Sequence, residues 1–181
     1  LDAAVASAAV MVGGAPLWET PAEHLRTLLD VDVVGVWNTA AAVVPHMLAG
    51  PDPSGCRFVA VASTAGEQGL FHLAGYTAAK HAVIGVVRGL VADLVGTGVT
   101  AVAVSPSSTD TDMLRATAAI YGVTVDELVA SDQQQRAATA VEVATTIVDC
   151  CSVESAVPAG AVVRATTGRT PGSDEPTGGV G

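Results

Sequence analysis

Residues 61–80 read VASTAGEQGLFHLAGYTAAK and hold three side chains that point to one chemistry. Tyr76 and Lys80 are four residues apart in a run typical of a helix, so both are predicted on one helical face. A cation beside a phenol lowers the pKa of the phenol, which would suit Tyr76 to exchange a proton near neutral pH. Ser63 follows a strand-like run at 57–62 and could hold a substrate oxygen against Tyr76. Lys80 is the only lysine in the chain.

At these residues the chain resembles the short-chain dehydrogenase/reductase family, which uses Ser, Tyr and Lys with the Ser thirteen residues before the Tyr. The segment TAGEQGLFHLAGYTAAKHAVIGVVRGL is most similar to the branch of the family that is associated with the redox cofactor mycofactocin. Tyr-x-x-x-Lys alone has a plain alternative interpretation, an exposed Tyr and a solvated Lys on a surface helix. The matching position of Ser63, with Gly66 after it, favours the functional interpretation.

The resemblance implies a Rossmann-like α/β/α fold with a parallel sheet. It begins at the family's fourth strand, so the first three strands and the Gly-rich pyrophosphate loop are expected to be absent. Residues 1–165 are expected to form this partial domain, and 166–181, rich in Gly, Pro and Thr, to be a disordered tail. The remaining strands would have the order 4-5-6-7, with the fourth as an open edge.

Apolar runs alternate with helical patterns along the chain, as parallel sheets require. Runs at 1–10, 57–62, 99–104 and 161–164 are predicted strands, and segments at about 22–48, 76–95 and 140–151 are predicted helices. Capping boxes are predicted at Thr20–Glu23, Thr124–Glu127 and Thr139–Glu142. The polar region 112–135 corresponds to the family's substrate lid, where Met113, Leu114 and Tyr121 could line the pocket or simply pack.

The resemblance also implies an NAD or NADP site. Tyr76 and Lys80 would face the cofactor, with Lys80 binding the nicotinamide ribose. Pro106 and Thr111 match the family's loop at the nicotinamide end, although Ser107 replaces a Gly, and an ordinary strand-to-helix loop is the alternative. Ala8 stands within residues 6–9, where the family has Asn-Asn-Ala-Gly beside the adenosine pocket.

Asp32 stands where the family has an Asn that it counts with the catalytic set. That Asn holds a water through its main-chain carbonyl, and Asp32 retains the carbonyl. Its carboxylate could also pair with Lys80 and raise the pKa of the lysine. A surface Asp on a helix is the alternative interpretation.

Composition excludes several other classes of function. A formal charge of −10 argues against nucleic-acid binding, which needs basic patches. No Lys/Arg cluster suits an anionic membrane, and no apolar run is expected to be long enough to span a bilayer. The three cysteines and four histidines show no metal-ligand spacing, and a reducing cytoplasm is expected.

Two hypotheses follow from these residues. The first is an NAD(P)-dependent enzyme that transfers hydride between the nicotinamide and a small alcohol or ketone. The second is a catalytically degenerate relative that acts as an oligomer partner. The helix at 76–95 is apolar on more than one face, and the resemblance implies that it and the preceding long helix pack against a second subunit, so a homo-oligomer is expected. A fully covered helix in a monomer is the alternative interpretation.

Overall fold

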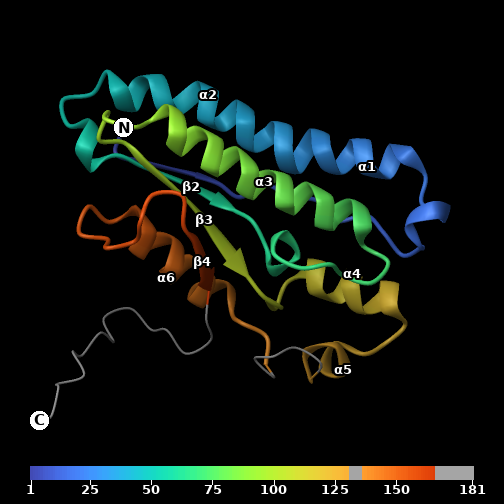
Figure 1. The fold of residues 1–181 in the computed structure, drawn as a ribbon. Helices are drawn as coiled ribbons and strands as arrows, with labels where there is room; N and C mark the ends of the chain where they lie inside the picture. Colours follow the sequence, from blue (N-terminus) through green and yellow to red (C-terminus); the bar gives the residue numbers. More distant parts are fainter. Residues whose placement is uncertain (131–135, 166–181) are drawn as a thin grey trace, which may run out of the picture.

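A computed structural model describes residues 1–130 and 136–165. Four parallel strands form one sheet in the order β1-β2-β3-β4 (Figure 1): β1 Ala3–Ala6, β2 Arg57–Val61, β3 Thr100–Pro106 and β4 Val162–Ala165. This confirms the expected parallel Rossmann-like sheet, with β1 at one edge. The expected disordered tail at 166–181 lies outside the described residues.

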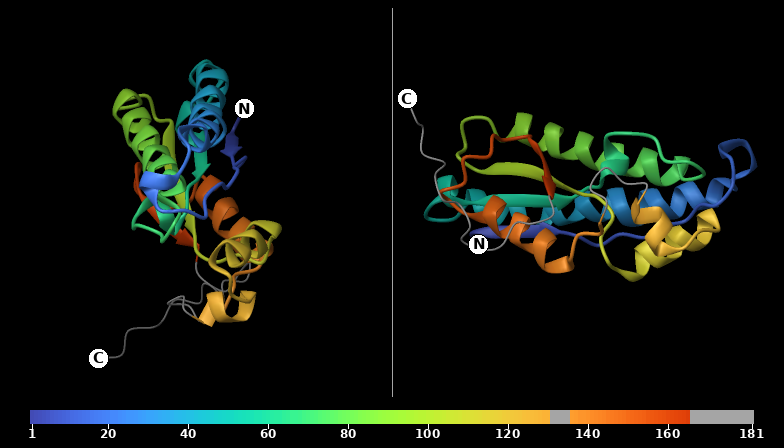
Figure 2. Two further views of the ribbon diagram at one scale, coloured as in Figure 1. Left: turned by 90° about the vertical axis from the view of Figure 1, so that its right-hand side faces the viewer. Right: turned by 90° about the horizontal axis from the view of Figure 1, so that it is seen from below.

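Helices cover both faces of the sheet, as the two further views show (Figure 2). On one face lie α1 Ala22–Leu28, the π-helical turn η2 Leu29–Val34, α2 Gly35–Leu48 and α3 Ala74–Asp93. The other face carries α6 Ala140–Cys151, while α4 Asp112–Tyr121 and α5 Val125–Ala130 follow the carboxyl end of β3. Short 3-10 turns are η1 Leu17–Glu19, η3 Pro53–Gly55 and η4 Thr64–Gly66.

The main core lies between the sheet and the helices α2 and α3. Phe58 of β2, Met47 of α2 and Val83 and Val87 of α3 are completely buried there. A smaller core forms where α6 covers the other face, around Val59, Val104 and Cys150. Burial on both faces explains why the strands read as continuous apolar runs rather than as alternating ones.

Two of the three predicted capping boxes are present. Thr139 and Glu142 cap α6 reciprocally, and Thr124 and Glu127 exchange the same pair of bonds at α5. The box predicted at Thr20 is wrong, because Pro21 is the N-cap of α1. The Thr20 hydroxyl instead donates to the carbonyls of Ala15 and Pro16, which turns it toward the preceding segment, and no side chain caps the helix.

One expectation about membranes needs correction. Residues 22–48 form a 27-residue helix with an 18-residue stretch of mean hydropathy 1.4, which is long and apolar enough to cross a membrane by length and composition. The expectation that no run reaches that length is therefore wrong. Core helices of soluble proteins meet the same criteria, and this helix carries the fully buried carboxylate of Asp32 and packs against the sheet.

Candidate active site

The site lies where β2 ends and η4 begins. Ser63 is the N-cap of η4, and its Oγ accepts a hydrogen bond from the N–H of Ala65 at 3.1 Å. The N–H of Gly66 donates to the carbonyl of Ser63 at 2.8 Å, which closes the turn. Functional side chains collect at this carboxyl edge of parallel sheets because the strands all end there.

Tyr76 and Lys80 lie on one face of α3, as their spacing predicts, and both are buried at 7% and 2% exposure. The Lys80 Nζ is 5.5 Å from the centroid of the Tyr76 ring. It also lies 3.4 Å from the carbonyl oxygen of Val61, at the end of β2. The helix thus brings the phenol and the ammonium to the strand end that precedes Ser63.

The Tyr76 hydroxyl has two neighbours beyond its own helix. The Met113 Sδ of α4 lies 3.8 Å from the Tyr76 Oη, and the Ser63 side chain lies close enough to the hydroxyl to act on its pKa. Burial raises the pKa of Tyr76 to about 12; Ser63 opposes this rise and the Asp32 carboxylate adds to it. The lowered pKa expected for Tyr76 is therefore wrong for this structure, because burial and the Asp32 carboxylate outweigh the effect of Ser63, which alone lowers the pKa.

Asp32 is fully buried and forms an ion pair with Lys80, with 3.2 Å between its Oδ2 and the Lys80 Nζ. Its Oδ1 accepts a hydrogen bond from the N–H of Val10 at 2.9 Å. The surface interpretation of Asp32 is thus excluded. Asp32 acts to raise the pKa of Lys80, as expected, but burial has the larger effect and the net direction is a lowered pKa.

The residues expected at the cofactor lie along the same edge of the sheet. Pro106 is the last residue of β3, Thr111 is exposed at the N-cap of α4, and Ala8 is exposed after β1. The Ser107 Oγ is buried with no hydrogen-bond partner in the structure. A buried polar atom without a partner fits a position where a polar cofactor group binds, so these residues suit the nicotinamide end of a dinucleotide.

For the pyrophosphate of the dinucleotide, the chain has no binding feature like the one at the nicotinamide end. The sequence contains no Gly-rich loop between a strand and a helix that could bring backbone N–H groups to a pyrophosphate. The residues present therefore fit half of a dinucleotide site. Among the described residues, no group of three or more His, Cys, Asp or Glu side chains could hold a metal ion.

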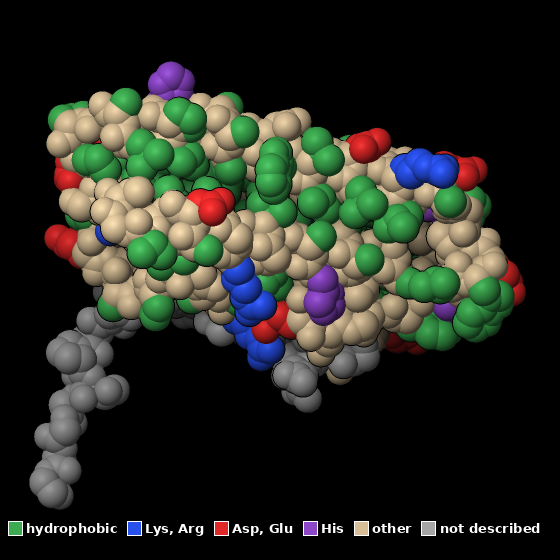
Figure 3. All heavy atoms as spheres, turned by 45° about the horizontal axis from the view of Figure 1, so that its top comes forward, with side chains coloured by type: hydrophobic (Ala, Val, Ile, Leu, Met, Phe, Trp, Pro, Cys, Tyr) green, Lys and Arg blue, Asp and Glu red, His purple; other side chains and the backbone are tan. Residues whose placement is uncertain are grey.

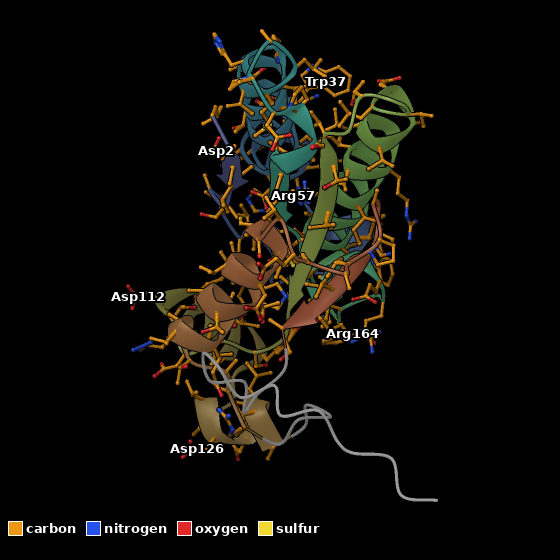
Figure 4. All side chains as sticks on the ribbon, turned by 90° about the vertical axis from the view of Figure 1, so that its left-hand side faces the viewer. Asp2, Trp37, Arg57, Asp112, Asp126 and Arg164 are labelled. Atoms are coloured by element: carbon orange, nitrogen blue, oxygen red, sulfur yellow. The ribbon has the colours of Figure 1, made fainter. Side chains whose placement is uncertain are left out.

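Sequence reasoning missed a clamp formed by Glu67, immediately after η4. Glu67 accepts a hydrogen bond from the hydroxyl of the buried Ser105 at 2.7 Å, and the Arg164 Nη2 of β4 lies 3.0 Å from its other carboxylate oxygen. Arg164 is labelled on β4 in Figure 4. The clamp ties the turn that carries Ser63 to β3 and β4. No motif could have indicated it, because Glu67 and Arg164 are 97 residues apart.

Comparisons with known proteins agree with this geometry. Residues 1–121 match the family model of the short chain dehydrogenases. The chain is 35% identical over 97 residues to (-)-trans-carveol dehydrogenase of Rhodococcus erythropolis, covering 54% of this chain and 34% of the relative. It is 32% identical over 114 residues to 2-dehydro-3-deoxy-L-rhamnonate dehydrogenase (NAD(+)) of Sphingomonas sp., covering 63% and 45%. The chain thus spans less than half the length of these curated relatives.

Among solved structures, an actinorhodin polyketide ketoreductase variant with NADPH is similar at a TM-score of 0.81 and 28% identity. The match covers 93% of this chain and 67% of that one. The fold described above is therefore shared over nearly the whole chain.

Proposed function

This chain belongs to the short chain dehydrogenase family, and we propose that the protein containing it is an NAD(P)-dependent oxidoreductase that interconverts a small alcohol and its ketone. The observation that carries the proposal is the cluster of Ser63, Tyr76 and Lys80 at one strand end, with Ser63 near the Tyr76 hydroxyl and the Lys80 Nζ 5.5 Å from the centroid of its ring. The named relatives are dehydrogenases, and the similar ketoreductase structure contains NADPH.

Each residue has a role that follows from its position. Tyr76 exchanges a proton with the substrate oxygen, and the Ser63 hydroxyl holds that oxygen in place. Lys80 sets the charge beside the phenol and lies near the position expected for the nicotinamide ribose. When bound, NAD or NADP takes up or supplies the hydride. Pro106, Thr111 and the partnerless hydroxyl of Ser107 hold the nicotinamide end, and Ala8 borders the adenosine side.

Met113 closes the site on the substrate side. Its Sδ covers the Tyr76 hydroxyl, and the apolar cluster around Tyr76 includes Leu73, Met11 and Leu70. An apolar alcohol or ketone would fit this wall better than a charged sugar acid, because an unpaired charge buried there would lose its hydration. The acidic formal charge of −10 remains an argument against a nucleic-acid partner.

The test is oxidoreduction by the natural polypeptide that contains these residues. Nicotinamide absorbance would be followed with NAD(H) or NADP(H) and a panel of apolar cyclic alcohols and ketones. Tyr76→Phe should lose at least ~100-fold in rate, since it removes the hydroxyl that exchanges the proton. Tyr121→Phe is the matched control and should keep its rate. Full turnover by Tyr76→Phe would refute the proposed role of Tyr76.

A second candidate is an oligomer partner without catalysis, and the outer face of the long helices favours a self-association surface in either case. Hydrophobic side chains gather over α2 and α3 (Figure 3). Val34 and Trp37 are 45% and 62% exposed, and in Figure 4 the Trp37 side chain lies on the α3 side of α2. Gly85 and Gly89 of α3 are exposed and have no side chain, so another helix could approach the α3 backbone closely there. We assign this face to a second copy of the chain.

Sedimentation of Trp37→Glu tests the assignment. The variant should dissociate to monomers, because it would bury a charge in the interface. Trp18→Glu is the control, since Trp18 is 82% exposed on η1 and lies outside this face. Equal oligomer size for both variants would exclude this surface. We place the protein in the cytoplasm, where a buried thiol such as that of Cys56 stays reduced.

A further inference from the structure

The charge of Lys80 is compensated inside the fold. Lys80 and Asp32 are 2% and 0% exposed, and 3.2 Å separates the Nζ from the Oδ2. The carboxylate is fixed by its other oxygen, which accepts from the Val10 N–H. Water cannot screen a pair buried in this way, so the carboxylate offsets most of the field that Lys80 would exert on its surroundings.

The helix geometry places Asp32 there. Asp32 lies in the π-helical turn η2, which interrupts the helix between α1 and α2. A π-helical turn accommodates an extra residue per turn and redirects the side chains within it. Asp30, on the same turn, is exposed, whereas Asp32 is fully buried. The turn therefore presents one of its two carboxylates to the site.

Tyr76 has both charges nearby. Its own helix contributes Lys80, whose Nζ is 5.5 Å from the ring centroid, and η2 contributes Asp32, which raises the pKa of the phenol. The turn after β2 contributes the neutral Ser63, and α4 the neutral Met113. A lone cation would favour the phenolate, but the neighbouring carboxylate opposes that effect. Together with burial, this holds the pKa of Tyr76 above its ordinary value, at about 12.

We propose that Asp32 is a positioning residue that compensates the positive charge of Lys80, keeps Tyr76 as a phenol at neutral pH and so sets the site to reduce a ketone rather than to oxidise an alcohol. In reduction, a bound reduced nicotinamide would supply the hydride for the new C–H bond. The carbonyl π pair moves to oxygen, which takes the proton of Tyr76, and the resulting phenolate is reprotonated from water. Oxidation needs the phenolate at the start. The directional part of this inference rests on the proposed function.

Titration of Tyr76 in the chain itself tests the charge effect without any turnover. Because the chain has two tyrosines, Tyr121→Phe leaves Tyr76 as the only phenol. Its ionisation can then be followed by ¹³C NMR of labelled tyrosine. In this background Asp32→Asn should lower the Tyr76 midpoint by about one pH unit or more, since it leaves Lys80 uncompensated. Asp30→Asn removes an exposed charge from the same turn and should leave the midpoint in place.

Circular dichroism must show that each variant is folded. An unchanged midpoint in folded Asp32→Asn would overturn the proposal. If Asp32→Asn does not fold, the proposal is tested on the Tyr121→Phe protein, which keeps Asp32. NMR of the single lysine should show a charged Lys80 at neutral pH, while Tyr76 stays protonated well above pH 9. A neutral Lys80, or a phenolate already formed near pH 8, would overturn the proposal.

The pH profile of turnover tests the direction. In the natural polypeptide, oxidation should rise toward high pH while reduction stays high at neutral pH. Asp32→Asn should move the oxidation profile to lower pH, with kcat changed more than KM. An unmoved oxidation profile would contradict the directional effect. If neither direction turns over, the proposed function fails, whereas the Tyr76 titration still decides the role of Asp32.

Discussion

Gly66 packs directly against the backbone of α3: a Cβ atom at Gly66 would lie 2.8 Å from the carbonyl oxygen of Lys80 and 2.8 Å from the Ile84 Cδ1. The turn that follows Ser63 can therefore approach the helix that carries Lys80 only because residue 66 has no side chain. This close approach fixes the distance between Ser63 and the helix.

Gly66→Ala should therefore destabilise the protein by about 1–3 kcal/mol, because the helix backbone cannot move aside as a flexible side chain could. Urea unfolding measures the loss. Gly69→Ala is the matched control, because Gly69 lies in the next loop and a Cβ there would meet nothing within 4 Å. Equal stability of the two variants would contradict the packing argument.

The Glu67–Arg164 pair should make stability depend on pH. Burial raises the pKa of Glu67, but hydrogen bonds from Arg164 and Ser105 have the larger combined effect and hold it below its ordinary value. A carboxyl with a lowered folded-state pKa stabilises above its unfolded pKa, and the effect disappears as pH falls through the folded value. The contribution should be only about 0.2–1 kcal/mol, since Arg164 is largely exposed.

Glu67→Gln should accordingly be less stable than the parent at pH 7, and the difference should shrink as the pH falls below about 4. Urea unfolding at a series of pH values gives the curve. Glu154→Gln, at an exposed residue, should show no such trend. A difference that persists undiminished at acid pH would mean that Glu67 acts through packing rather than charge.

The sequence predicted the sheet well because strands buried on both faces leave a plain apolar signal. It also predicted that Tyr76 and Lys80 share a helical face, which depends only on local spacing. It could not predict the pKa of Tyr76. That value depends on burial and on Asp32, which is 44 residues away and turned inward by a π-helical turn.

Competition between local bonds limited the prediction of helix starts. The motifs at Thr20 and Thr139 look alike in the sequence, yet only Thr139 caps its helix. The Thr20 hydroxyl donates instead to the carbonyls of Ala15 and Pro16, which precede the turn η1. The Glu67 clamp had no sequence signal at all, because contacts between distant strands are set by the fold.

The isolated chain should bind dinucleotides weakly or not at all. The nicotinamide end has the partnerless Ser107 hydroxyl and Thr111, whereas the sequence has no Gly-rich loop for the pyrophosphate. Titration calorimetry with NAD(H) and NADP(H) on the 181-residue chain measures this. Tight binding by the chain would show that the pyrophosphate is held by other residues.

Removal of Lys80 should cost stability as well as activity. Lys80→Met keeps the length of the side chain but leaves Asp32 as a buried carboxylate without its partner, which should destabilise the fold by about 3–5 kcal/mol. Lys80→Arg should not restore full activity, since a planar guanidinium does not replace a compact ammonium in a closed site.

The double variant Lys80→Met with Asp32→Asn separates charge from packing. Asn can still accept from the Val10 N–H, so the double variant retains that bond while it removes both charges. It should recover about 1–3 kcal/mol relative to Lys80→Met alone, which urea unfolding of the four proteins in the cycle would measure. Strict additivity of the two single changes would show that Asp32 and Lys80 do not interact, and the account of their pairing would then be wrong.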